Sequence, residues 1–138
     1  VKRAVAIAQG TDFVEKMENT YDADISQSGT NISGGQKQRL SIARAVCRRP
    51  EIYIFDDSFS ALDYRTDRDL RAALRQETQG VTSLIVAQRI GTIMNADRIL
   101  VLDEGRVVGM GTHRELLKTC DVYREIAMSQ LSEEELAL

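Results

Sequence analysis

The sequence contains a single proline, no glycine- or serine-rich tract and no long apolar run. The scarcity of flexible tracts excludes a linker, and no run approaches the roughly 18 apolar residues that cross a bilayer. The first ten residues are too interrupted to act as a signal peptide. Because hydrophobic residues make up 43% and charged residues 28% of the 138 residues, the composition predicts an ordinary globular chain with a core.

Metal-ligand spacing is also missing. Cys47 and Cys120 lie far apart, and His113 is the single histidine of the chain. We therefore expect both cysteines to be reduced thiols in the core. The net charge of −3 argues against general nucleic-acid binding. Cations gather between residues 37 and 49, either at a helix end where the dipole favours them or as a phosphate-contacting patch.

The N-terminal part of the chain predicts helices. Residues 1–20 have helical spacing with a break near Gly10. A polar, turn-rich loop follows over residues 21–35, and an amphipathic helix over residues 36–49. Pro50 ends the last helix, whose apolar face should include Cys47. The chain starts with Val1 rather than Met, and we expect it to be a piece of something longer.

From residue 51 onward, strands alternate with helices. We expect strands at 52–55, 82–87 and 98–102, and an antiparallel return strand at 106–111 after a tight turn. Helices are expected at 64–79, 91–96, 112–118 and 121–130, followed by a frayed acidic tail. This order predicts an α/β fold with a parallel sheet, in which the strands at 52–55 and 82–87 read as covered on both faces.

Two side-chain pairs should stabilise these helices. Asp67 is four residues before Arg71, so the two can form an ion pair on one helix face. Thr112 and Glu115 have the spacing of a capping box.

Asp56 and Asp57 follow the apolar strand at 52–55. Neighbouring side chains of a strand point to opposite faces, so the two carboxylates should diverge unless the strand ends between them. At the carboxyl edge of the sheet, where α/β proteins bind ligands, Asp56 could serve Mg²⁺ and Asp57 could face an attacking water. The alternative is a polar strand end whose aspartates cap loop amides.

The stretch NISGGQ, residues 31–36, combines helix-capping side chains with two glycines. Free amides at a helix start, the hydroxyl of Ser33 and the missing Cβ atoms of Gly34 and Gly35 are typical of an anion site, above all a phosphate site. The alternative is a capped loop whose glycines serve the turn.

Together, these stretches resemble the ATP-binding-cassette (ABC) ATPases over nearly the whole chain. NISGGQ is similar to the family's signature motif, IYIFDD (52–57) to its Walker B strand, and SALD (60–63) to its D-loop. SLIVAQRI (83–90) resembles the switch strand, and residues 96–117 resemble the closing hairpin and helix of exporter-type cassettes.

The resemblance implies a partial P-loop NTPase-like parallel sheet over residues 50–138 and a helical signature subdomain, also partial, over residues 1–49. It implies ATP and Mg²⁺ as cofactors, with Asp56 as the metal ligand. The implied nucleotide contacts are Ser33, Gly34, Gly35, Gln36, Ser60 and Asp63. A transmembrane domain and a second ABC subunit, with no nucleic acid, would be the partners, at the cytoplasmic face of a membrane (the plasma membrane in a bacterium).

Three departures from the family pattern bear on activity. The phosphate-binding loop G-x-x-x-x-G-K-[S/T] is absent and by family order should precede Val1. Asp57 stands where the family usually has Glu, and a shift of about 1 Å in such a carboxylate can cost roughly a hundredfold in rate. Gln88 stands where His is usual, and an amide can hydrogen-bond a phosphate but cannot carry a proton as imidazole does.

The intact signature and the altered Asp57 and Gln88 resemble one subunit of a heterodimeric exporter. Its signature would complete the ATP site of a partner that carries the Walker B Glu, while its own site would be catalytically degenerate. One alternative is a non-hydrolytic interaction module, because the chain itself lacks the phosphate loop and is expected to be inactive. Another is a family member that works on DNA or ribosomes. Taken alone, the chain should leave apolar strand surface open to pairing, unless it forms a self-sufficient small α/β fold.

Overall fold

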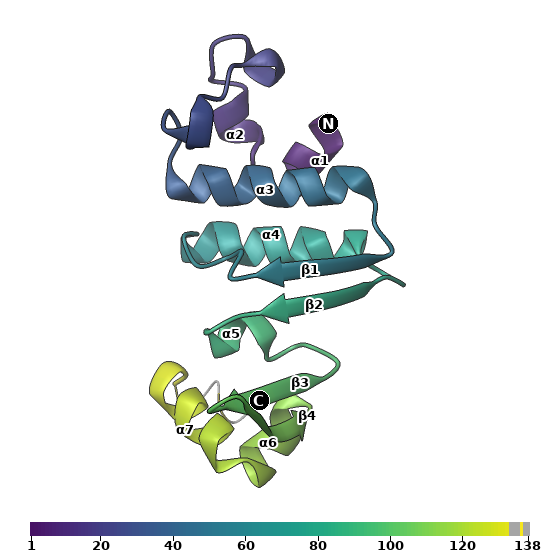
Figure 1. Cartoon of the computed structure of the whole chain (residues 1–138), viewed down its shortest axis with the longest axis vertical. Coiled ribbons are helices and arrows are strands. Elements are labelled where there is room, and N and C mark those ends of the chain that lie inside the picture. The colour runs from purple at the N-terminus through teal and green to yellow at the C-terminus, as the bar shows by residue number, and fades with distance from the viewer. Residues whose placement is uncertain (133–135, 137–138) are drawn as a thin grey trace. The chain divides into compact units, whose positions relative to one another are not determined.

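The computed structural model (Figure 1) describes residues 1–132 and residue 136, and it divides into two units, Val1–Val86 and Ala87–Leu138. The acidic tail that we expected to fray lies largely outside the described residues. Within the described part of the chain, no helix has the length and apolar character needed to cross a membrane.

The first unit contains helices and a two-stranded sheet. Its helices and strands are α1 (Lys2–Ile7), α2 (Thr11–Val14), α3 (Gly34–Arg48), β1 (Ile52–Asp56), α4 (Tyr64–Glu77) and β2 (Thr82–Val86). Two short 3-10 turns, η1 (Thr20–Asp22) and η2 (Gln27–Gly29), lie between α2 and α3. Strands β1 and β2 are parallel, with Ile54 opposite Leu84, which confirms the expected parallel sheet. Helix α4 makes the crossover between them, as parallel pairing requires.

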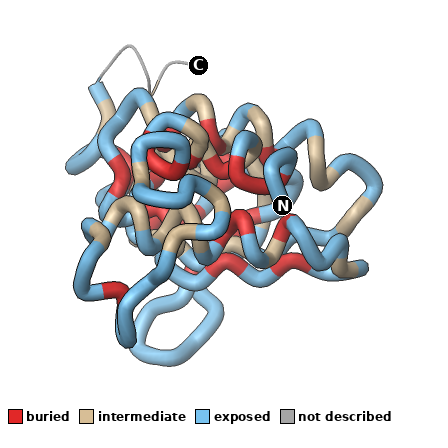
Figure 2. The backbone as a smooth tube through the Cα atoms, turned by 90° about the horizontal axis from the view of Figure 1, so that it is seen from above, coloured by how far each residue is buried: buried red, intermediate tan, exposed pale blue. Residues whose placement is uncertain are grey.

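One face of β1 belongs to the core of this unit. The rings of Tyr53 and Phe55 are stacked with their centroids 5.6 Å apart, and both pack in a buried cluster with Ile42 of α3 and Leu70 of α4. In Figure 2 such buried positions recur as short red segments separated by exposed or half-buried ones. The periodicity arises because each helix and strand turns only part of its surface inward.

The other face of the sheet is open. Ile54 of β1 is 68% exposed and Leu84 of β2 is 55% exposed, so the expectation that both faces are covered is wrong for this chain. The expectation of open apolar strand surface is confirmed. Alternate side chains of a strand point to opposite faces, and the helices of the first unit supply cover for only one of them.

The second unit contains α5 (Ile90–Ile93), β3 (Ile99–Asp103), β4 (Arg106–Gly111), α6 (His113–Thr119) and α7 (Asp121–Gln130). Strands β3 and β4 are antiparallel. The turn residues Glu104 and Gly105 both have positive φ, 44° and 76°, as in the two-residue turns that match strand twist. The expected tight hairpin is therefore confirmed.

His113 and Tyr123 form a buried polar pair in the second unit. Nδ1 of His113 lies 2.7 Å from the hydroxyl of Tyr123, and no described residue binds the buried Nε2. Burial, and secondly the charge of Arg114, lower the pKa of His113. Burial raises the pKa of Tyr123 to about 12. The pair is therefore held uncharged near neutral pH.

The predicted local side-chain pairs are confirmed. Arg71 Nη2 lies 2.8 Å from Asp67 Oδ2, and Thr112 and Glu115 form the expected capping box. Both pairings depend only on helical spacing, which the sequence displays directly.

Two expectations in the N-terminal part are wrong. The first helical stretch ends at Val14 rather than near residue 20. Asn19 and Thr20 have left-handed backbones, with φ of 62° and 48°, which an α-helix running to residue 20 could not contain. Cys120 is buried as expected, but Cys47 is exposed. The buried side of α3 passes through Val46, and Cys47 lies about 100° further round the helix.

Candidate functional site

The signature turn, residues 31–36, leads into α3. This helix begins at Gly34, whereas the sequence predicted that it begins at Gln36. The Ser33 hydroxyl accepts a hydrogen bond from the Gln36 amide at 3.2 Å, and Gln36 Oε1 accepts one from the Ser33 amide at 2.8 Å. This reciprocal capping box satisfies two of the free amides at the helix start. Ser33 and Gly34 nevertheless remain exposed, so the positive end of a 15-residue helix is open to an anion.

Gly35 has a partner of its own in the first unit. A Cβ built at this position would lie 3.0 Å from the carbonyl oxygen of Ala61, in the D-loop-like segment, whereas one at Gly34 would have 3.9 Å to its nearest atom. The missing side chain of Gly35 therefore allows α3 to approach this segment closely. Sequence reasoning assigned both glycines either to ligand approach or to the turn, and it did not find this contact.

The chain reverses direction just after Asp56, the last residue of β1. Asp57 has a left-handed backbone with φ of 45°, a conformation that aspartate tolerates better than most residues. Its amide donates to the carbonyl of Val86 at 3.0 Å, and its carbonyl accepts from the Ser60 hydroxyl at 3.2 Å. The strand thus ends between the two carboxylates, and strand alternation no longer relates their directions.

The side chain of Gln38, in α3, forms hydrogen bonds with the segment that follows β1. Its Nε2 donates to the Asp57 carbonyl at 3.2 Å and to the Ser60 hydroxyl at 3.1 Å. The Ala61 amide donates to its Oε1 at 3.0 Å. The N-terminal end of α3 and the carboxyl end of β1 accordingly lie at the same end of the first unit (Figure 1). Sequence reasoning missed Gln38, since its partners are about twenty residues away in the chain.

Asp63 has a defined role at the start of α4. Its Oδ1 accepts a hydrogen bond from the Thr66 amide at 3.0 Å, so it is the helix N-cap. This hydrogen bond holds the pKa of Asp63 below its usual value, because it favours the charged form. An exposed carboxylate that already caps a helix stays ionised and fixes where the D-loop-like segment ends.

Gln88 lies in the second unit, and its side chain is exposed. Its backbone is anchored by Gln130, whose Nε2 donates to the Gln88 carbonyl at 3.0 Å and whose Oε1 accepts from the Ile90 amide at 2.8 Å. The backbone around Gln88 is therefore fixed, while the residue itself is exposed and accessible to a ligand.

The residues at the end of β1 fit a magnesium ion that a phosphate would share. Within residues 1–132 no group of three potential ligands could hold a metal by itself. Magnesium is usually bound by one or two carboxylates together with substrate phosphates and water. Asp56, exposed at the carboxyl end of β1, is such a carboxylate, and the ion would supply charge neutralisation for phosphate oxygens.

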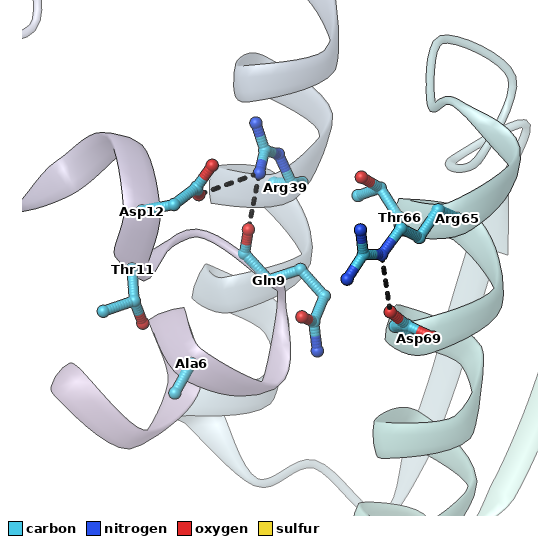
Figure 3. A pocket seen from close by; sticks show the side chains of 8 residues that line it. All are labelled: Ala6, Gln9, Thr11, Asp12, Arg39, Arg65, Thr66 and Asp69. Carbon is cyan, nitrogen blue, oxygen red and sulfur yellow. Dashed lines mark hydrogen bonds and ion pairs between the residues drawn. The ribbon is translucent and has the colours of Figure 1, made fainter.

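A polar pocket of about 310 Å³ lies elsewhere in the first unit, between α1, α2, α3 and α4 (Figure 3). Its two cations are already paired: Arg39 with Asp12 at 3.1 Å and Arg65 with Asp69 at 4.0 Å. Arg39 also stacks on the ring of Phe13. The lining includes none of the predicted site residues, so this pocket is separate from the signature turn and the end of β1.

The β1–α4–β2 crossover gives an α/β fold with a parallel sheet, and the carboxylate of Asp56 lies at the carboxyl end of β1, the edge where such sheets bind ligands. Residues 5–60 match the ABC transporter family. The chain is 48% identical over 127 residues to an uncharacterized ABC transporter ATP-binding protein of Mycobacterium tuberculosis, covering 92% of this chain and 22% of the relative. It is 41% identical over 133 residues to an ATP-dependent lipid A-core flippase of Hahella chejuensis, covering 96% of this chain and 23% of the relative.

A solved structure agrees with these sequence relatives. The structure of a bacterial Atm1-family ABC exporter with ATP bound superposes with a TM-score of 0.88 at 38% identity, covering 94% of this chain and 23% of that one. The chain is thus similar in sequence and fold to part of the ATPase domain of ABC transporters. It spans less than a quarter of the length of the relatives that it matches.

Proposed function

We propose that this chain is the signature- and switch-bearing part of the nucleotide-binding domain of an ABC exporter. Residues 1–49 would form the helical signature subdomain and residues 50–138 the later part of the ATP-binding core. The similarity to a lipid flippase and to an Atm1-family exporter supports ATP-driven export. A transmembrane domain would carry the transported substrate, and the chain would work at the cytoplasmic face of the membrane.

The signature turn would complete an ATP site held by a second ABC subunit. One observation carries this part of the proposal: Ser33 and Gly34 stay exposed at the open start of α3 although the turn is fully formed. A helix start that is capped and exposed suits a phosphate brought by another chain. Gln36, Ser60 and Asp63 would line or support the same nucleotide-facing edge.

The chain's own site would turn ATP over slowly. Asp56 would be the magnesium ligand. Asp57 would orient the attacking water with a carboxylate one methylene shorter than Glu, and Gln88 would hydrogen-bond the terminal phosphate without moving a proton. The partner subunit's own ATP site would carry the competent Glu carboxylate, so the two sites of the heterodimer would hydrolyse ATP at unequal rates.

The test is the variant Ser33→Ala in the full-length transporter, with Ser41→Ala, an exposed serine of the same helix, as the matched control. Nucleotide is trapped with vanadate and a photoreactive ATP analogue identifies the subunit that holds it. We expect Ser33→Ala to reduce trapping at the partner's site more than at this chain's site, and Ser41→Ala to change neither. Loss confined to this chain's own site would contradict the assignment.

A second function is favoured by the open sheet face. Ile54 and Leu84 expose apolar surface, and the sequence has no phosphate-binding loop, so the 138-residue chain could pair and regulate without binding nucleotide. Nucleotide binding by the chain, measured beside binding and turnover by the full-length transporter, separates the two functions. Binding by the chain itself would exclude the non-nucleotide module.

A further inference from the structure

We propose that Gln38 is a positioning residue that couples the position of the signature turn to the position of the Asp57 carboxylate in the same chain. This inference deepens the proposed function and rests on it. It assigns to one side chain the link between the site that the turn would complete for a partner and the site at the end of β1.

Both the nitrogen and the oxygen of the Gln38 side-chain amide form hydrogen bonds. Its nitrogen donates to the Asp57 carbonyl and the Ser60 hydroxyl, at 3.2 and 3.1 Å, and its oxygen accepts from the Ala61 amide at 3.0 Å. Because a backbone amide can only donate, the Ala61 contact fixes which end of the side-chain amide faces Asp57. Gln38 therefore holds this loop by three hydrogen bonds in a single orientation.

The residue that Gln38 holds has an unusual backbone. Asp57 has φ of 45°, and left-handed conformations of non-glycine residues persist when their surroundings over-determine them. On one side its amide is bound by the carbonyl of Val86 at the end of β2. On the other side its carbonyl is bound by Ser60 and Gln38. Removal of Gln38 loosens one of these two restraints, and the Asp57 carboxylate moves with its backbone.

The same helix end carries the signature turn. Gln38 lies five residues after Ser33 and within one continuous helix, so the turn and the Gln38 backbone move together. Gly35 adds a second contact, since only its missing Cβ lets α3 approach the Ala61 carbonyl. A phosphate that displaces or fixes the start of α3 therefore changes the position of Asp57. By thermodynamic reciprocity, a ligand bound at Asp57 changes the affinity of the signature turn for phosphate.

The experiment uses the full-length transporter, in a background where the partner subunit's competent Glu is replaced by Gln. Residual single-turnover hydrolysis then reports this chain's own site. Gln38→Met keeps the side-chain volume and removes all three hydrogen bonds. Gln38→Glu keeps the acceptor for Ala61 but removes the donor to Asp57. Gln76→Met, at an exposed position of α4, is the matched control.

We expect Gln38→Met to slow hydrolysis at this site about ten- to a hundredfold at unchanged KM for ATP, and to speed hydrogen exchange of the Ala61 amide at least tenfold. Gln38→Glu should slow hydrolysis equally while Ala61 stays protected, and Gln76→Met should change neither. This split separates positioning of Asp57 from general loosening of the loop. Asp57→Asn, expected to slow the same step, is the benchmark for the proposed function.

Unchanged Ala61 exchange in Gln38→Met would overturn the hydrogen-bonded link itself. Unchanged hydrolysis in Gln38→Met, in a complex where Asp57→Asn is slow, would overturn the positioning role and leave the proposed function intact. If Asp57→Asn is silent, the proposed role of Asp57 fails, and so does any action of Gln38 through it.

Discussion

Replacing Gly35 by alanine should destabilise the first unit, whereas the same change at Gly34 should not. Both glycines lie in the first turn of α3, where alanine is intrinsically favoured by about 0.5–1 kcal/mol. A Cβ at Gly34 has its nearest atom at 3.9 Å, which is ordinary contact. A Cβ at Gly35 meets the Ala61 carbonyl oxygen at 3.0 Å, so a backbone atom must move by a few tenths of an ångström.

The difference between the two variants isolates the cost of this collision. Their gains in helix propensity cancel, and a side chain that forces backbone to shift costs about 1–3 kcal/mol. With a denaturant slope of roughly 2 kcal/mol per molar urea, the unfolding midpoint of Gly35→Ala should lie about 0.5–1.5 M below that of Gly34→Ala. Urea unfolding followed by circular dichroism measures both.

The outcome also bears on the role of the signature glycines. An equal or higher midpoint for Gly35→Ala would mean that α3 does not approach Ala61 this closely, and the packing that supports Gln38 would be refuted with it. The expected result would instead assign Gly35 to contact within its own chain and leave Gly34 as the exposed glycine of the turn.

Three further outcomes are expected. In the full-length transporter of the proposed function, Asp57→Glu with Gln88→His should raise hydrolysis at this chain's own site about ten- to a hundredfold. The stability cost should be about 1 kcal/mol for Glu in a left-handed conformation, and no gain in hydrolysis would contradict the proposal that this site is slow. The pKa of His113 is lower in the folded chain than in the unfolded chain. Neutral His113 therefore contributes its full stability above the unfolded pKa of about 6.5, and this contribution is lost as the pH falls through the lower folded pKa. The urea midpoint of His113→Gln should accordingly change less between pH 7.5 and pH 5 than the midpoint of the unaltered chain. Ile54→Lys should reduce concentration-dependent self-association in sedimentation experiments, whereas Tyr64→Lys, at an exposed position of α4, should not; equal effects would point to net charge instead.

Local features of the fold were predictable from the sequence. The Thr112–Glu115 capping box, the Asp67–Arg71 pair and the hairpin turn at Gly105 each depend on residues within four positions of one another. Such short-range chemistry is visible in a single sequence. The parallel pairing of β1 with β2 followed from the alternation of strands and helices.

Features that depend on packing between distant segments were not predictable. The hydrogen bonds of Gln38 join residues up to 23 positions apart, and a glutamine on a helix carries no sign of its partners. The exposure of Cys47 depends on how α3 is rotated against its neighbours, and the left-handed backbone of Asp57 depends on restraints from β2 and α3. The candidate site was therefore predicted as a set of residues but not as a connected structure.

The two hydrophobic clusters share no residue: one belongs to Val1–Val86 and the other to Ala87–Leu138. Heat can therefore melt the chain in two steps, and in that case the calorimetric enthalpy exceeds the van't Hoff value. The chain contains no tryptophan, so one introduced at Phe59 or at Tyr123, each buried in a different cluster, would report by fluorescence on one half at a time.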